Sequence, residues 1–252
     1  MPAATLAGNA VLEGVMTAAL LFIIVTAVRW VVAEHGVAEA IGSVNAQVAV
    51  VAAVAAASVL TIILSPAGRR SGAHLNPAVT IALWQMRAFP ARAVVPYVVA
   101  QLIGSIIGVG AARLAWGTVV AAAPTRYGAV GPASGWRWLD VGFAEAACLV
   151  VVTLIIGYFL AHPESRMRRA LPYALATVTF AIAAGLGTLS GASVNPARQL
   201  GPALWSGDYA FLLCYLVAPV VGAVIGARIH LRLVRQPVQT YKLSGDRHHS
   251  GL

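Results

Sequence analysis

The chain has 252 residues, of which 60% are apolar and 10% are charged. An ordinary soluble domain is about 45–50% apolar and about 25% charged. Even a chain of about 300 residues leaves about a quarter of its unfolded-state surface in water, so a soluble fold has no room to bury this much apolar surface. The mean hydropathy of +0.82 agrees. The composition therefore predicts a membrane protein.

The spacing of the charged residues predicts six membrane-spanning helices. A helix needs about 20 residues to cross about 30 Å of hydrocarbon. Two of the uncharged stretches are longer than one span requires. The six stretches without Asp, Glu, Lys or Arg are 14–28, 40–68, 93–112, 146–163, 170–197 and 209–227.

The basic residues indicate topology. Twelve of them fall on one side of a six-span arrangement and four on the other, and Arg198 directly follows the last long stretch. The positive-inside rule then places both termini in the cytoplasm, as in a multi-pass protein of the cell (inner or plasma) membrane. The basic residues form no patch beside stacking aromatic residues, so we expect membrane lipid and no nucleic acid as a partner.

The two cysteines and the two ends of the chain give no indication of a functional site. Cys148 and Cys214 both lie within apolar spans, so neither an extracellular disulfide framework nor a metal site is expected. Residues 1–12 carry no charge and lack the basic region of a signal peptide, so the first span is expected to remain in the mature protein. The end of the chain, residues 234–252, is expected to be a flexible cytoplasmic tail.

The two long stretches end in related sequences. Residues 71–80 read Ser-Gly-Ala-His-Leu-Asn-Pro-Ala-Val-Thr, and residues 190–198 read Ser-Gly-Ala-Ser-Val-Asn-Pro-Ala-Arg. Upstream, the first span of each half carries one acidic residue, Glu13 or Glu145. This pattern indicates an internal duplication. Three spans per half is an odd number, so the second half must enter the membrane with opposite polarity, as in the inverted repeats of many transport proteins.

The repeat defines the expected organisation of the chain. Residues 1–117 form the first repeat, 118–137 an extracellular connecting loop, 138–233 the second repeat and 234–252 the tail. The expected fold class is an all-α membrane protein with six transmembrane helices and two re-entrant half-helices.

Each Asn-Pro-Ala motif predicts the start of a half-helix. Asn is a favoured N-cap and Pro a favoured first helical residue. After the first motif only about nine helix-compatible residues follow, which reach about half of the hydrocarbon thickness. Two half-helices from opposite faces would meet N-terminus to N-terminus, where their dipoles repel protons and the Asn amides donate to neutral solutes. The motifs are Asn76-Pro77-Ala78 and Asn195-Pro196-Ala197.

Both motifs, their spacing, the six spans and the two Glu residues resemble the major intrinsic protein family, the aquaporins and glycerol facilitators. The resemblance runs from about Glu13 to Arg232. It implies a homotetramer with one pore in each subunit. It also implies passive flow, with no cofactor and no enzymatic chemistry.

The resemblance also locates the outer constriction of the pore at Ala56, Ala183, Ala192 and Arg198. Water-selective members of the family carry an aromatic residue at the first position and His at the second, and this chain has neither. Residues 40–68 contain no aromatic residue or His, and 170–197 contain no His. We therefore expect a wide pore that passes water and small neutral solutes such as glycerol, urea or undissociated metalloid acids. Arg198 could instead only bind loop carbonyl groups.

Other positions do not agree on which solutes the channel passes. Glycerol facilitators typically follow the motif's Arg with Asp and carry a basic residue four positions later, where this chain has Gln199 and Ala203. The small residues of the constriction are similar to those of plant nodulin-like channels. A water-selective channel with little solute flux therefore stays open as an alternative.

Glu13, Glu145 and His74 are candidate loop-supporting residues. Re-entrant loops expose backbone N–H groups that need buried acceptors, and there is one Glu for each loop. The alternative is an ion-coupled carrier in which Glu13 and Glu145 relay protons. His74 could also face the pore and gate it by protonation. An intramembrane enzyme finds no supporting motif, and a structural junction protein is not excluded.

Overall fold

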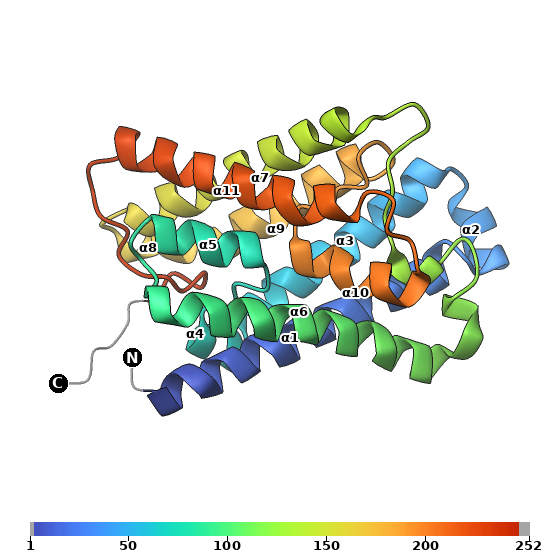
Figure 1. Cartoon of the computed structure of the whole chain (residues 1–252), viewed down its shortest axis with the longest axis horizontal. Coiled ribbons are helices and arrows are strands. Elements are labelled where there is room, and N and C mark those ends of the chain that lie inside the picture. The colour runs from blue at the N-terminus through green and yellow to red at the C-terminus, as the bar shows by residue number, and fades with distance from the viewer. Residues whose placement is uncertain (1–2, 247–252) are drawn as a thin grey trace.

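The computed structural model describes residues 3–246, and these residues form helices and loops without strands (Figure 1). Six helices are long and apolar enough to cross a membrane, which confirms the predicted number of spans. The spans consist of α1 (Ala3–Val31), α3 (Val44–Leu64), α6 (Ala91–Trp116) extended to Val120, α7 (Trp138–Ala161), α9 (Leu171–Leu186) together with the preceding α8 from Ser165, and α11 (Leu212–Leu233).

Shorter helices connect the spans or enter the bundle. The two that follow the Asn-Pro-Ala motifs, α5 and α10, are the half-helices. The surplus of the second long uncharged stretch, 170–197, thus becomes re-entrant loop and the start of α10, whereas the first re-entrant loop and α5 follow the end of the stretch 40–68. The short elements are α2 (His35–Ile41), α4 (Pro66–Ser71), α5 (Pro77–Gln85), η1 (Gly117–Val120), η2 (Arg126–Gly128), α8 (Ser165–Arg169) and α10 (Pro196–Ser206).

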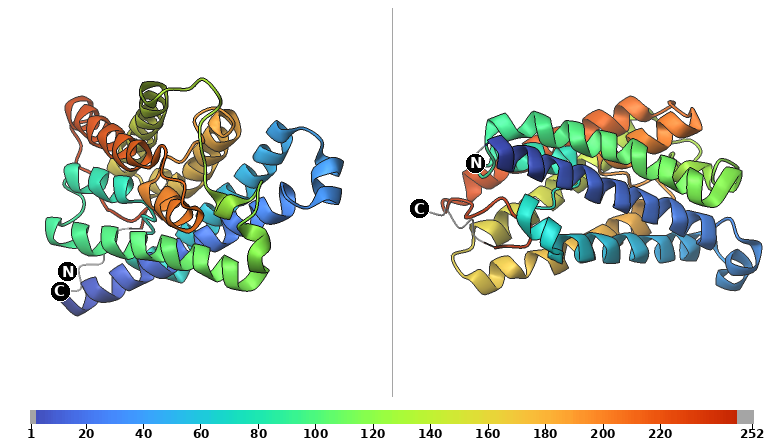
Figure 2. Two further views of the ribbon diagram at one scale, coloured as in Figure 1. Left: turned by 45° about the vertical axis from the view of Figure 1, so that its right-hand side comes forward. Right: turned by 90° about the horizontal axis from the view of Figure 1, so that it is seen from below.

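The two halves pack in the same way, through glycines that bring helix backbones together. Helix α1 lies along α6, and α7 lies along α11 (Figure 2). A Cβ at Gly104 of α6 would overlap the carbonyl oxygen of Gly14, and a Cβ at Gly222 of α11 would overlap that of Ala146. Small residues at such contacts let membrane helices approach closely. The shared contact agrees with an inverted repeat.

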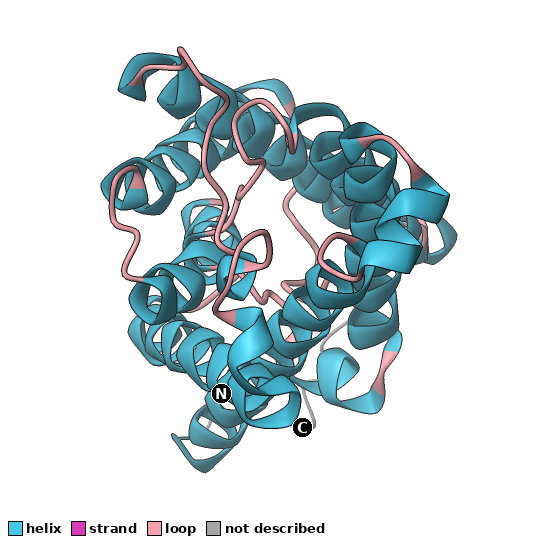
Figure 3. Cartoon of the chain, turned by 90° about the vertical axis from the view of Figure 1, so that its right-hand side faces the viewer, coloured by secondary structure: helices cyan, strands magenta, loops and turns pink. Residues whose placement is uncertain are grey.

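The spans surround a central region that the two re-entrant segments occupy. Seen along the long axis, the helices form a ring, and loops pass through its interior (Figure 3). Non-helical backbone at membrane depth is tolerated only where protein buries it or a water-filled cavity solvates it. The loops at 72–76 and 190–195 meet this condition, because most of their residues are buried.

The two ends of the bundle carry different segments. The loop end carries α2 and the connecting segment 117–137, and the terminal end carries α4, α8 and the tail (Figure 1). The described tail residues run from 234 to 246 and return toward the bundle.

The expectation of a flexible tail is wrong for its last described residues. Thr240, Tyr241, Leu243 and Ser244 are buried, each with 5% or less of its surface exposed. The backbone N–H of Gln239 donates to the carbonyl of Leu160 in α7. Apolar burial and backbone hydrogen bonds therefore order a segment whose composition is polar. Residues 247–252 of the expected tail lie outside the described residues.

Candidate functional site

The two Asn-Pro-Ala motifs meet at the centre of the ring. The Oδ1 atom of Asn76 accepts from the N–H of Ala78 at 2.9 Å, and Oδ1 of Asn195 accepts from the N–H of Ala197 at 2.9 Å. Each Asn is therefore the N-cap of its half-helix, as the sequence predicted.

The same two Asn side chains link the halves of the molecule. Nδ2 of Asn76 donates to the carbonyl oxygen of Val194, and Nδ2 of Asn195 donates to that of Leu75, both at 2.9 Å. An amide nitrogen has two hydrogens, so one remains on each Asn. Both Asn residues line the cavity described below. Each can therefore donate a hydrogen bond to a solute.

Glu13 is a fully buried acceptor for the first re-entrant loop. Its carboxylate accepts from the backbone N–H of His74 at 3.1 Å and of Leu75 at 2.8 Å. It also accepts from the hydroxyl of Ser71 at 2.7 Å and from the side-chain amide of Gln101 at 2.9 Å. Four donors around one carboxylate hold this loop in a fixed shape, since buried donors without partners are costly.

Glu145 holds the second loop in the corresponding way. Its carboxylate accepts from the hydroxyl of Ser190 and the N–H of Ser193, both at 3.1 Å, and from the N–H of Val194 at 2.5 Å. Glu145 is also fully buried. The two carboxylates therefore have the predicted contacts with their loops.

The loops need these acceptors because their backbones are strained. Ala73 and Leu75 have φ of 55°, and Ala192 and Val194 have φ of 45°. Residues with a Cβ rarely occupy this left-handed region, which costs on the order of 1–3 kcal/mol each. The strained backbone turns the carbonyls of Leu75 and Val194 toward the opposite Asn while their N–H groups point to Glu.

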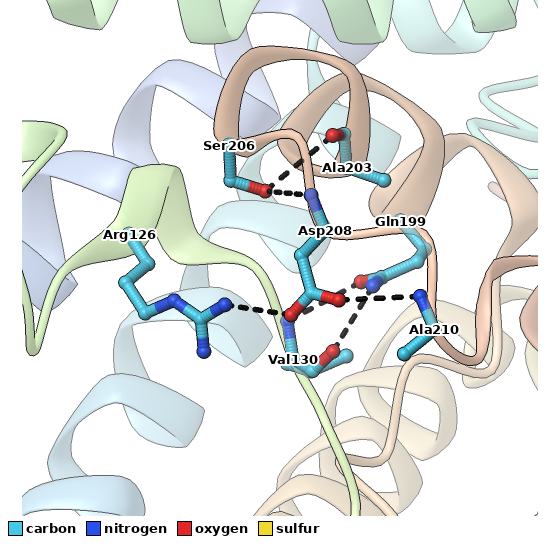
Figure 4. A network of polar contacts seen from close by, with 7 residues as sticks. All are labelled: Arg126, Val130, Gln199, Ala203, Ser206, Asp208 and Ala210. Carbon is cyan, nitrogen blue, oxygen red and sulfur yellow. Dashed lines mark hydrogen bonds and ion pairs between the residues drawn. The ribbon is translucent and has the colours of Figure 1, made fainter.

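Arg198 and Gln199 connect the second half-helix to the connecting segment. Nη1 of Arg198 donates to the carbonyl of Gly128 at 2.8 Å. The side-chain amide of Gln199 donates to the carbonyl of Val130 at 3.0 Å and accepts from its N–H at 3.4 Å (Figure 4). Arg198 also lines the cavity, so it both binds a loop carbonyl and faces the passage. The sequence did not identify Gln199 as an anchor.

An ion pair reinforces this region near the surface. Nη2 of Arg126 lies 2.7 Å from Oδ2 of Asp208 (Figure 4). Oδ1 of Asp208 accepts from the N–H of Ala210. The pair is partly exposed, so it contributes little to stability, typically about 0–1 kcal/mol. It marks where segment 117–137 contacts the end of α10.

A cavity of about 340 Å³ runs through the ring from the loop end toward the terminal end. Ala183, Ala192 and Arg198 line it, together with Asn76 and Asn195. Among its lining residues His74 is the single residue with a ring, and most of the others are aliphatic. On α3 the lining residues are Val48, Val51, Ala52, Ala55, Val59 and Ile63.

Ala56 is not among the residues that line the cavity. It is buried, with 7% of its surface exposed, while Ala52 and Ala55 of the same helix face the cavity. At this level of α3 the lining residues are thus Ala52 and Ala55, and the assignment of Ala56 to the constriction stays a prediction that the cavity lining does not support. The reason is the direction of the helix face, since Ala55, Val59 and Ile63 are spaced by one turn.

His74 lies at the end of the cavity nearest the terminal end. Its Nδ1 is 3.1 Å from Oγ1 of Thr80, and its Nε2 is 3.1 Å from the carbonyl oxygen of Tyr241 in the tail. The ring packs against Phe89 and Tyr97 with centroid distances of 4.8 Å and 5.3 Å. His74 therefore belongs to a packed aromatic cluster, beside its backbone contact with Glu13.

Metal-ligating side chains do not cluster in the part of the chain that the structure describes. Residues 3–246 contain no group of three or more His, Cys, Asp or Glu side chains able to hold a metal ion. Cys148 and Cys214 are buried in different places. The polar groups at the cavity are suited to hydrogen bonding with an uncharged solute.

Comparison with known proteins identifies the family. The sequence profile of the major intrinsic protein family matches residues 4–230. The chain belongs to this family. Its members are passive channels and not enzymes, which agrees with the expectation from the motifs.

Relatives within the family include an archaeal and a plant protein. The "Probable aquaporin AqpM" of Archaeoglobus fulgidus is 36% identical over 184 residues, which cover 67% of this chain and 70% of the relative. Nodulin-26 of Glycine max is 34% identical over 175 residues, which cover 68% of this chain and 61% of the relative. The match thus spans less than two thirds of nodulin-26.

A solved structure confirms the fold. The aquaglyceroporin of Plasmodium falciparum superposes with a TM-score of 0.76 at 21% identity, covering 90% of this chain and 96% of that one. At this identity the likeness concerns the fold alone. The predicted all-α fold with six spans is confirmed.

Proposed function

We propose that this membrane channel passes water together with small uncharged solutes such as glycerol, urea or undissociated metalloid acids. The observation that carries the proposal is the composition of the cavity wall around Arg198. Alanines at 52, 55, 183 and 192 line the same cavity as Arg198, and no Phe, Tyr or Trp is among the lining residues. A methyl group in place of a ring leaves room beside Arg198 for a molecule larger than water.

The wall and the donors together suit a polyol or an amide. Hydroxyl or carbonyl oxygens of the solute would accept from Arg198 and from the free hydrogens of Asn76 and Asn195. The C–H side of the same solute would face aliphatic residues such as Val51 and Ile182, which also line the cavity. A solute with one polar and one apolar side meets partners on both.

Proton exclusion is part of the proposal. Helices α5 and α10 begin at Asn76 and Asn195, so the positive ends of both helix dipoles point to the middle of the passage. Arg198 adds a full positive charge nearby. Such a field repels cations and excludes protons.

Two alternatives are weighed against this proposal. A water-selective channel needs a narrower wall, and the alanines at the constriction disfavour it. An ion-coupled carrier would use Glu13 and Glu145, but both carboxylates are fully buried, accept several hydrogen bonds and do not line the cavity. Their contacts favour a role in holding the loops.

Orientation and assembly complete the proposal. The family resemblance supports a homotetramer in the cell membrane with one pore in each subunit. The positive-inside rule supports cytoplasmic termini, because Arg69, Arg70, Arg166 and Arg169 gather at the terminal end. Cross-linking in membranes, and protease access to the tail in right-side-out and inside-out vesicles, test these two statements.

Stopped-flow light scattering on proteoliposomes tests the solute range. Purified protein is assayed with a sucrose gradient for water and then with glycerol, urea and boric acid, beside protein-free vesicles. The assay includes a variant that ends at Val238, because the tail contacts the cavity. In this shortened chain we expect fast water flow, re-swelling with the small solutes and no collapse of a proton gradient. Fast water flow with none of the solutes passing in the shortened chain would support the water-selective alternative.

A further inference from the structure

The tail reaches the cavity itself at the terminal end. After α11 the chain turns back, and Leu243 is one of the residues that line the cavity, beside Ala73 and His74 of the first re-entrant loop. Leu243 has 3% of its surface exposed. An apolar side chain from the end of the chain therefore lies at the mouth of the passage.

Backbone contacts fix the tail against the first re-entrant loop. The N–H of Leu243 donates to the carbonyl of Gly72 at 3.0 Å. The carbonyl of Tyr241 lies 3.1 Å from Nε2 of His74, and since a carbonyl only accepts, Nε2 is the donor. A Cβ at Gly72 would lie 3.0 Å from the ring of Tyr241, so glycine permits this approach. The tail thus fits a surface made by the loop that carries the first motif.

Further contacts hold the segment at its outer side. Oδ2 of Asp246 lies 2.9 Å from Nη1 of Arg69 and accepts from the hydroxyl of Ser244 at 3.0 Å. The hydroxyl of Thr240 donates to the carbonyl of Asp246 at 2.8 Å, which closes residues 240–246 into a turn. Gly245 has φ of +77°, and a Cβ there would overlap the carbonyl of Arg168. The segment is therefore built to occupy this position.

The two ends of the cavity differ in their access to solvent. Near the tail the lining residues Ile63, Ala73, Leu75, Ile156 and Leu175 are buried, each with 5% or less of its surface exposed. Near the loop end Val28, Val32, Val48 and Ala183 are half-buried. The cavity wall around Leu243 is therefore apolar and includes several fully buried side chains.

We propose that residues 240–246 are a plug that closes the terminal end of the pore, with Leu243 as the barrier side chain. The proposal rests on the proposed channel function. Hydrophobic constrictions stop permeation by excluding water. A full-length channel with its plug seated conducts slowly, and displacement of the plug opens it.

The outer contacts make the plug separable from the bundle. Arg69 and Asp246 are partly exposed, with side-chain exposures of 46% and 30%, so their ion pair is weak and screened by salt. The plug follows the last span of the chain. It can therefore leave its seat while the six spans stay packed.

Four proteins test the plug by the water permeability of proteoliposomes: the full chain, a variant ending at Val238, Leu243→Ala and Gly245→Val. The shortened chain and Gly245→Val displace the plug, and Leu243→Ala removes its side chain while the backbone contacts remain. We expect permeability per protein to rise by about tenfold in the shortened chain and in Gly245→Val, since an apolar gate is removed. The rise in Leu243→Ala should be smaller.

Gly135→Val is the matched control. Gly135 also has a positive φ, +86°, but lies at the loop end with no neighbouring atom within 4 Å of a Cβ. It carries the same backbone strain as Gly245→Val without a contact to the tail, so its permeability should equal that of the full chain. Helix content and gel-filtration profiles test whether each variant is folded. If the shortened chain does not fold, the permeability of Leu243→Ala tests the plug.

The outcomes separate the plug from the channel. Equal, fast water flow in all proteins would overturn the plug and leave the channel function standing. Slow flow in every protein, with the shortened chain folded, would overturn the channel function and the plug with it. Slow flow in the full chain and fast flow in the plug variants, with Gly135→Val unchanged, supports both.

Discussion

The two re-entrant loops have the same internal construction and opposite surroundings. In each, a serine begins the loop, a left-handed backbone follows, a buried glutamate accepts the N–H groups, and a tyrosine hydroxyl donates to the serine carbonyl. Tyr97 makes that bond to Ser71 at 2.8 Å, and Tyr215 makes it to Ser190 at 2.5 Å. The duplicated sequence thus builds the same loop twice.

What covers each loop is not duplicated. The second loop faces the loop end of the bundle, where Arg198 and Gln199 attach it to the connecting segment. The first loop faces the terminal end, where His74 and Gly72 contact the tail. The shared construction therefore provides the pore centre, while the parts outside the repeat distinguish a selective end from a closing end.

The largest expected effect comes from removing the shared acceptors. Glu13→Ala leaves four donors unsatisfied and Glu145→Ala leaves three, at about 1–3 kcal/mol for each buried donor. We expect both to lower the apparent melting temperature in detergent strongly, and Glu13→Ala the more. A Glu13→Ala protein as stable as the unmodified chain would contradict the role assigned to this carboxylate.

A somewhat smaller loss is expected from the glycines that pack the two halves. Gly104→Ala and Gly222→Ala place a methyl group against a helix backbone that cannot rotate away, at a cost of about 1–3 kcal/mol or more. The two losses should be similar, since the contact is the same in each half. Gly185→Ala in α9, which has no neighbour within 4 Å of a Cβ, is the control and should retain the full melting temperature.

The next prediction concerns the selective end and separates two adjacent alanines. Ala55→Phe places a ring in the cavity, so glycerol flux should fall by on the order of tenfold while stability is kept. Ala56→Phe places the ring among buried side chains, so its main effect should be a loss of about 1–3 kcal/mol in stability. Both are measured in the chain ending at Val238. A selective loss of solute flux in Ala56→Phe would support the assignment of Ala56 to the constriction.

The smallest expected effect is at Gln199. Gln199→Ala removes two hydrogen bonds to Val130, at about 1 kcal/mol each, and loosens the segment whose Gly128 carbonyl holds Arg198. The ratio of glycerol to water permeability should change by a small factor with little loss of stability. Asp208→Asn, at the exposed ion pair nearby, is the control, and an equal change there would mean that Gln199 is no specific anchor.

The sequence predicted the parts of the molecule that involve large free-energy costs. Charges are expensive in hydrocarbon, so their absence marked the six spans. Asn76 and Asn195 have strong N-cap chemistry and stand before Pro, so the half-helices were also predictable. Glu13 and Glu145 were assigned to the loops because the N–H groups of a re-entrant loop need buried acceptors, and each repeat has one Glu.

The predictions that the structure does not support concern segments whose sequences do not strongly favour one orientation or conformation over another. Helix α3 has Ala or Val at most positions, so no pattern of large and small residues distinguishes the face of Ala55 from that of Ala56. The tail has a polar composition that is typical of mobile ends. Its order depends on Tyr241 and Leu243 two positions apart and on the tight seat at Gly245, and the seat is visible only in three dimensions.

The reciprocal bonds of the two Asn side chains have a consequence for biosynthesis. Each half-helix is capped within its own repeat, but Asn76 donates to a carbonyl made by the second half, and Asn195 donates to one made by the first. A first half emerging alone into the bilayer has a strained loop with no partner for its Leu75 carbonyl. Translation of the second half supplies that partner, so the centre of the pore is completed only when both halves are in place.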